Sequence, residues 1–185
     1  MSYQKPQKIA ELTVETGYKK ATNPFSTMIV LGFLAGAFIA LGYLLYIRVI
    51  ASVPAEWGSF SSFLGASVFP VGLILVLLAG GELLTGNMMA VPLARIMGRI
   101  STWETVRNLL VITVSNFLGA IFVAIGFQHV VANMFVIPAA IFAGHFSWGE
   151  YLANFIPVFL GNFVGGCIFV ALSYRIAYLR KVEIK

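Results

Sequence analysis

Long apolar segments with almost no charge are the feature that most restricts how this chain can fold. Between about residues 24 and 94 the only charged side chains are Arg48, Glu56 and Glu82. Across the chain, 59% of the residues are hydrophobic and 10% are charged, whereas a soluble domain usually carries about 25% charged residues. A soluble core of this size cannot bury so much apolar surface, so the sequence predicts an integral membrane protein with the lipid bilayer as its solvent.

The positions of the basic residues argue against nucleic acid as a partner and predict a topology. The pI is near 9.5, but the basic residues flank apolar segments and form no stripe with interleaved aromatic residues. They gather in the N-terminal segment, in the loop that contains Arg95 and Arg99, and at the C-terminus. By the positive-inside rule we expect both termini in the cytoplasm, in a multi-pass protein of the plasma membrane.

Four apolar runs can be distinguished, at about 27–47, 63–92, 103–143 and 151–178. A spanning helix needs roughly 20 mostly apolar residues. The second run is too long and too rich in glycine for one plain helix. The third would be about 60 Å long as one helix, twice the thickness of the bilayer core. We therefore expect the third run to cross the membrane once, with part of it folding back within the protein.

The expected organisation is one transmembrane domain, residues 25–180, between two short cytoplasmic segments. Residues 181–185 form the cytoplasmic tail. Residues 1–24 are predicted to form an amphipathic helix on the membrane surface, with Ile9, Leu12 and Val14 on one side. A disordered tail is the alternative for this segment.

The chain repeats itself at an offset of 46 residues without a gap. GGELLTGNMMAVP at 80–92 aligns with GFQHVVANMFVIP at 126–138. Beyond these segments the matched pairs are Gly98 and Gly144, Ser101 and Ser147, Glu104 and Glu150, Asn108 and Asn154, and Asn116 and Asn162. Each Ser-x-x-Glu pair is typical of a capping box that opens a helix. Duplicated halves with broken helices are common in transporters, so we predict that the two interrupted segments face each other across a pore or site.

Polar residues in these two segments are the candidates for function. His129 lies inside an apolar run, where an ionisable group is a functional hypothesis by default. It can transfer a proton to a weak-acid anion or hold the anion, or it can simply be satisfied by a neighbouring carbonyl. Thr85 and Asn87 can donate to an anion or cap the broken helix end, and Asn133 is the repeat equivalent of Asn87. Glu82 is expected to accept hydrogen bonds from backbone N–H groups at that helix end.

Several apolar and small residues have two interpretations. Phe69, Leu73, Leu83 and Phe122 are either constrictions of a pore or ordinary packing residues. The run of small residues at Gly161, Gly165 and Gly166 predicts a close helix contact.

Enzyme functions find little support in the sequence. His129, His145 and Cys167 do not have the spacing of a metal-ligand set, and no phosphate-binding loop is present. An intramembrane serine hydrolase would use Ser115 near His129, but Ser115 lacks the context of an oxyanion loop. We therefore expect no enzyme activity, no metal and no cofactor.

Four segments of the chain resemble the formate/nitrite transporter family. GGELLTGN at 80–87 and GFQHVVANMF at 126–135 are similar to its two broken-helix motifs. YKKATNPFSTMIVLGFLAGAFIALG at 18–42 is similar to its first helix, and NFIPVFLGNFVGG at 154–166 with YRIAYLR at 174–180 to its last. The resemblance implies an all-α, aquaporin-like fold with inverted halves, assembled as a homopentamer in which each protomer has its own pore for formate, nitrite or hydrosulfide.

The same resemblance assigns expected roles to residues of this chain. His129 corresponds to the central pore histidine, Thr85 to the threonine that faces it, and Asn133 to a pore-region asparagine. Gln128 stands where many members have glutamate. The apolar constrictions fall at Phe69, Leu73 and Leu83, and also at Phe122.

One segment of the family pattern is missing. Members have six spanning helices, whereas here the end of the third helix, GAIFVA, runs directly into the second half of the fifth, IGFQHV. The fourth helix and the first half of the fifth are absent near residues 124–125, which predicts a shortened fold of about four spans with two broken helices. Two hypotheses follow: a channel or proton-coupled carrier for small monovalent anions, or a non-conducting truncated subunit that assembles with full-length relatives.

Overall fold

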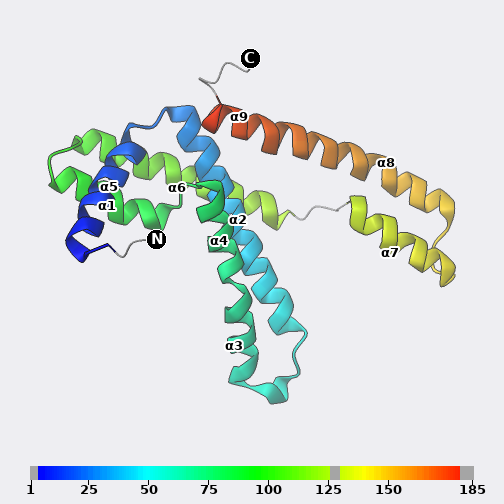
Figure 1. Ribbon diagram of the computed structural model, residues 1–185. Helices are drawn as coiled ribbons and strands as arrows, with labels where there is room; N and C mark the ends of the chain where they lie inside the picture. The colour runs from blue at the N-terminus through cyan, green and yellow to red at the C-terminus, as the bar shows by residue number, and fades with distance from the viewer. Residues whose placement is uncertain (1–3, 126–129, 180–185) are drawn as a thin grey trace. The chain divides into compact units, whose positions relative to one another are not determined.

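The computed structural model describes residues 4–125 and 130–179, and these are helical apart from short connections (Figure 1). No strand occurs within the two described ranges, as expected for an all-α protein. The chain divides into two compact units, residues 1–125 and 126–185.

The first unit is a helical bundle in which α1 packs against α5, and α2 packs against α6, α3 and α4 (Figure 1). In chain order its elements are α1 (Pro6–Thr22), α2 (Phe25–Ala51), the 3-10 turn η1 (Ala55–Trp57), α3 (Ser59–Val68), α4 (Pro70–Ala79), α5 (Leu84–Ile96) and α6 (Thr102–Ala124). The N-terminal segment is therefore a helix, and the alternative of a disordered tail is wrong. Gly17 and Ala21 of α1 are buried, whereas Ile9 and Leu12 are about half exposed.

Within the described residues, four helical segments are long and apolar enough to cross a membrane: Phe25–Ala51, Ser59–Ala79, Thr102–Ala124 and Trp148–Tyr178. Each overlaps one of the four predicted apolar runs. The second run is interrupted after Ala79, as its glycines predict. The third run is not one helix, because α6 ends at Ala124 and a separate, shorter helix begins at Val130. The protein is a multi-pass, all-α membrane protein.

Glycine allows α2 and α6 to approach each other closely. A Cβ atom placed on Gly36 would lie 2.0 Å from the backbone oxygen of Asn116, and one on Gly119 would lie 2.0 Å from the backbone oxygen of Phe33. Small residues at helix interfaces are a main source of packing energy in membranes. The close contact predicted at Gly161, Gly165 and Gly166 is not made in the described chain, where no neighbouring atom lies within 4 Å of the corresponding Cβ positions.

Gly36→Ala should therefore destabilise the first unit, whereas Gly161→Ala should not. The added methyl group at position 36 meets a backbone oxygen that cannot move away, and overpacking of this kind costs about 1–3 kcal/mol. At position 161 the methyl group meets open space, and alanine favours the helix by about 0.5–1 kcal/mol. Melting temperatures in detergent check this, and equal values for the two variants would contradict the α2–α6 contact.

The second unit contains α7 (Val130–Phe142), α8 (Trp148–Val164), the π-helical segment η2 (Gly165–Leu172) and α9 (Ser173–Tyr178). The α7 and α8 helices pack against each other as a hairpin.

The structure confirms the repeat of 46 residues. The last residues of α5 (Leu84–Ile96) and of α7 (Val130–Phe142) differ by this offset. Gly98 and Gly144 have positive φ angles of 71° and 79° in the turns that follow, where glycine is favoured. Both predicted capping boxes form, at the starts of α6 and α8. The α5–α6 and α7–α8 hairpins are thus two copies of one structural unit.

Candidate functional site

The first interrupted segment is a short non-helical break, residues 80–83, between α4 and α5. Gly80 ends α4 in the left-handed conformation, with φ of 67°, which favours glycine. The backbone N–H of Gly81 donates to the carbonyl oxygen of Val76 at 2.8 Å, and that of Glu82 donates to the carbonyl oxygen of Leu31 at 3.0 Å. The break is therefore tied to both α4 and α2.

Asn116 of α6 satisfies the other backbone groups around the break. Its Nδ2 donates to the carbonyl oxygens of Glu82 at 2.9 Å and Gly32 at 2.8 Å. Its Oδ1 accepts from the backbone N–H of Leu84, the first residue of α5, at 2.9 Å. Non-helical backbone at membrane depth requires partners of this kind. Asn116 therefore caps the start of α5. The interpretation of Thr85 or Asn87 as the side-chain cap of this helix is wrong.

Glu82 lies in a buried polar network that also contains Lys20. Its side chain accepts hydrogen bonds from Asn87 Nδ2 at 2.7 Å, from Asn23 Nδ2 at 3.1 Å and from Lys20 Nζ at 3.3 Å. Glu82 is 3% exposed. Its partners are side chains and not the backbone N–H groups of a helix end, so the role expected for Glu82 is wrong. A buried carboxylate is tolerated when it is paired and hydrogen-bonded in this way.

The network continues from the break into α1 and α6. Asn87 accepts from Lys20 Nζ at 2.9 Å and donates to Asn108 Oδ1 at 2.9 Å. Asn108 in turn donates to the backbone oxygen of Lys20 at 2.9 Å. Asn87 and Asn108 are fully buried. The network therefore fixes the amphipathic N-terminal helix to the break.

An open groove of about 250 Å³ lies beside the break. Its lining comes from α1, α4, the break and α5: Thr13, Thr16, Lys20, Leu73, Val76, Leu77, Gly81, Leu83, Gly86, Met89 and Ala90. Two of the four predicted constriction residues, Leu73 and Leu83, are thus brought together with the ammonium-bearing side chain of Lys20. Thr85 is exposed, at the second position of α5.

The other two predicted constriction residues contact aromatic rings of α2. The ring of Phe69 meets that of Tyr43 edge-on at 5.9 Å between centroids. The ring of Phe122 meets that of Phe33 at 5.3 Å. Their role as constrictions stays a prediction.

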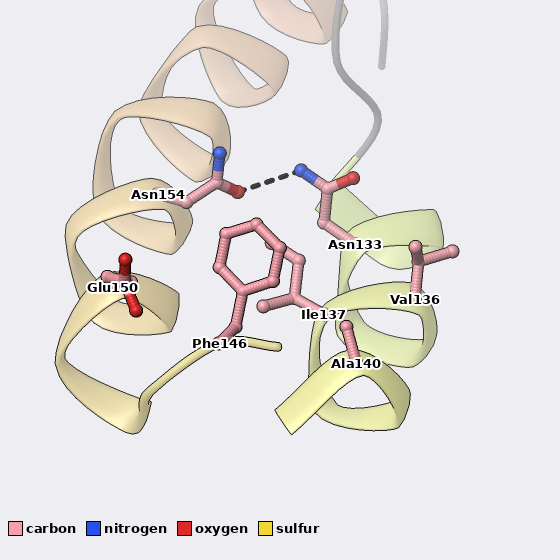
Figure 2. Close-up of a pocket in the computed structure, with 7 residues that line it drawn as sticks. All are labelled: Asn133, Val136, Ile137, Ala140, Phe146, Glu150 and Asn154. Atoms are coloured by element: carbon pink, nitrogen blue, oxygen red, sulfur yellow. Dashed lines mark hydrogen bonds between the residues drawn. The ribbon is translucent and has the colours of Figure 1, made fainter. Parts of the chain in front are cut away.

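In the second unit the structure describes the part of the repeated motif that follows residue 129. His129 and Gln128 lie outside the described residues. Asn133 of α7 donates from Nδ2 to Asn154 Oδ1 of α8 at 2.8 Å. Figure 2 shows these two side chains meeting between the helices, with the ring of Phe146 next to them. The bond is the repeat equivalent of the bond from Asn87 to Asn108.

The described residues do not form the arrangement that a serine hydrolase or a metal site would need. Ser115, the nucleophile of the hydrolase hypothesis, is 3% exposed, and its Cβ would lie 2.7 Å from a Cβ on Gly32 of α2. Within residues 4–125 and 130–179, no group of three or more His, Cys, Asp or Glu side chains could hold a metal ion.

Together these features define a class: a multi-pass membrane protein with a repeated helical hairpin and a broken helix before the first copy, features that are common in transporters. The chain belongs to the formate/nitrite transporter family, whose model matches residues 7–125 and 120–176. The two matches meet at residues 120–125, the place where the fourth helix was predicted to be missing. No solved structure gives a significant match to the chain.

Among curated relatives, the uncharacterized transporter YrhG of Bacillus subtilis strain 168 is 56% identical over 131 residues, which are 71% of this chain and 49% of that protein. The formate channel BtFdhC of Bacillus thuringiensis is 51% identical over 130 residues, 70% of this chain and 50% of the relative. A probable formate transporter of Methanothermobacter thermautotrophicus is 40% identical over 126 residues, 66% of this chain and 46% of the relative. The chain thus spans about half the length of these relatives.

Proposed function

We propose that this chain carries small monovalent anions, such as formate, nitrite or hydrosulfide, across the plasma membrane as a channel or proton-coupled carrier. Membership of the formate/nitrite transporter family and the similarity to a formate channel support this function. The observation that carries the proposal is the groove beside the first break, which places Leu73 and Leu83 next to Lys20. In the proposal the transmembrane domain is residues 25–180, both termini are cytoplasmic, and the chain works as a homopentamer without a cofactor.

In the proposed passage, the apolar groove removes water from the anion. Polar groups of the protein then take the place of that water. Leu73 and Leu83 exclude water from the anion. Lys20 compensates the charge of Glu82, so an anion that passes the break is not repelled by an unpaired carboxylate. The exposed hydroxyl of Thr85 orients the anion, and Asn87 holds the network behind the break in place.

The second half of the pathway is proposed to centre on His129. Its imidazole protonates the anion or stabilises it by charge and hydrogen bond, because the intrinsic pKa of histidine, about 6.5, lies near neutrality. Asn133 contributes a polar group on α7, four residues after His129 in the chain.

A comparison of anions in proteoliposomes that contain only the purified chain tests this function. Formate, nitrite and hydrosulfide should enter faster than sulfate by at least about ten-fold, since a doubly charged ion loses far more hydration energy in an apolar groove. Protein-free vesicles give the background. Entry of all four anions at the background rate would contradict transport by this chain.

A second candidate function is a non-conducting subunit that assembles with full-length relatives. The chain covers about half of those relatives, and the two family matches join without the segment between them. Absence of flux from the chain alone, combined with co-purification of a co-expressed longer relative, would favour this function over the first.

A further inference from the structure

A pocket of about 310 Å³ lies between α7 and α8 of the second unit (Figure 2). The residues that line it include Asn133, Val136, Ile137, Ala140, Phe146 and Asn154. Its walls are apolar except for the carboxylate of Glu150 and the bonded pair Asn133 and Asn154. Of these residues, only Asn133 has a role in the proposed pathway.

Each of these residues is the repeat equivalent of a residue in the first unit that lies under or beside α1. At an offset of 46 residues the corresponding positions are Asn87, Ala90, Val91, Ala94, Ile100 and Asn108. Ala21 of α1 forms one buried cluster with Val91, Ala94 and Ile100. The pocket therefore has the position of the surface that α1 occupies in the first unit.

The contacts of α1 show what such a surface is built to hold. A Cβ on Gly17 would lie 1.9 Å from the backbone oxygen of Ala90, so the two helices nearly touch. Four residues on, Ala21 is fully buried. Between them, Lys20 donates to Asn87 and accepts from Asn108 through its backbone oxygen. Both apolar and polar parts of the surface are thus satisfied by one helix.

The equivalent residues of the second unit are far more exposed. Ala90 is 2% and Ile100 is 7% exposed, whereas Val136 is 57% and Phe146 is 52% exposed. Within the described residues, Val136 and Phe146 thus lack the cover that α1 gives to Ala90 and Ile100.

We propose that this pocket is the seat of a helix like α1, supplied by a longer chain of the formate/nitrite transporter family. The proposal rests on the second candidate function, in which this chain assembles with full-length relatives. It identifies the surface through which that assembly would form. The family matches meet just before α7, so this chain has no room there for its own second copy of α1 and α2. About half of each of the longer relatives lies outside the part that matches this chain, which leaves sequence for such a helix.

The α1 helix of a second copy fits the pocket less well. Larger side chains line the pocket, because Val136 and Phe146 stand at the positions that correspond to Ala90 and Ile100. The occupant should therefore carry small residues four positions apart and a hydrogen-bonding side chain that reaches Asn133 and Asn154.

Cysteine labelling in membranes tests whether a helix of a longer relative covers the pocket, and it needs no transport assay. In a Cys167→Ser background, Ala140→Cys is treated with maleimide, with the chain expressed alone or together with the formate channel of Bacillus thuringiensis. Phe146→Cys is a second probe of the pocket. Ala94→Cys, under the chain's own α1, should be protected in both cases, and His145→Cys, in the exposed turn between α7 and α8, should be labelled in both.

We expect Ala140→Cys and Phe146→Cys to be labelled in the chain alone and protected by at least five-fold in the presence of the relative. Protection in the chain alone would overturn the proposal, because the pocket would then be covered by its own chain or by a second copy. If labelling is unchanged while the relative co-purifies, the pocket is not the contact surface. The proposal would then be rejected, whereas the second candidate function would remain supported. Unchanged labelling without co-purification would overturn both.

Discussion

His129→Phe should abolish the pH dependence of formate flux in proteoliposomes. Flux through the parent chain is expected to rise as the pH falls, because the protonated imidazole attracts the anion and can protonate it. Phenylalanine preserves the ring but removes both functions. Formate flux at pH 6 should fall by about ten-fold, the effect of losing roughly 1.4 kcal/mol of interaction with the anion.

His145→Phe is the matched control for this variant. His145 is exposed in the turn between α7 and α8 and has no proposed role in the pathway. Its replacement should leave both the rate and the pH profile unchanged. The same pH profile in His129→Phe and in the parent chain would reject the role of His129, whatever the absolute rate.

Lys20→Met should be among the most destabilising single changes in the first unit. The change leaves the carboxylate of Glu82 buried without its cation, and breaking a buried ion pair from one side costs about 3–5 kcal/mol. We expect the lower end of this range, since the Lys20 side chain is 22% exposed. Lys20→Met also removes the hydrogen bond to Asn87. Thermal unfolding in detergent measures the loss.

The double variant Lys20→Met, Glu82→Gln separates charge from packing. Glutamine keeps an acceptor for Asn23 and Asn87 but carries no charge, so the double variant should regain more than half of the lost stability. Replacing both members of a buried pair is often nearly neutral. Lys19→Met, one residue earlier and exposed, should have almost no effect. Equal melting temperatures for Lys19→Met and Lys20→Met would contradict the network.

The number of spans, the break in the second run and the repeat could all be predicted from the sequence. Hydropathy decides which segments enter a bilayer, because lipid solvates only apolar side chains around satisfied backbone. Glycines at 80 and 81 indicate the break, since one of them needs the left-handed conformation. The aligned residues at 98 and 144 and the two Ser-x-x-Glu pairs correspond to turns and caps that depend on local sequence alone.

The partners of the break could not be predicted in the same way. Lys20 and Glu82 are 62 residues apart in the chain, and a lysine just before a membrane span is equally explained by the positive-inside rule. Asn108 and Asn116 were recognised as repeat pairs, but their bonds cross from α6 to other helices. The repeat itself was the available signal, because an asparagine kept in both copies suggests a shared structural role.

The glycines at which two helices approach closely also could not be predicted from the sequence. The sequence contains several glycine-rich helices, and close contact was expected for the run at 161–166. The structure instead places the closest approaches at Gly36 and Gly119. Which glycines meet a neighbouring backbone depends on the crossing point of two helices, and local composition does not determine that point.

Uptake of labelled formate by vesicles that contain only this chain is the most direct test of whether a shortened member of the family still transports. The purified chain and the formate channel of Bacillus thuringiensis are reconstituted in parallel at equal protein density, with protein-free vesicles as background. We expect the chain alone to take up formate well above background, with a rate that rises from pH 8 to pH 6. Background uptake by folded, membrane-inserted chain, beside active uptake by the longer channel, would contradict transport by the shortened protein.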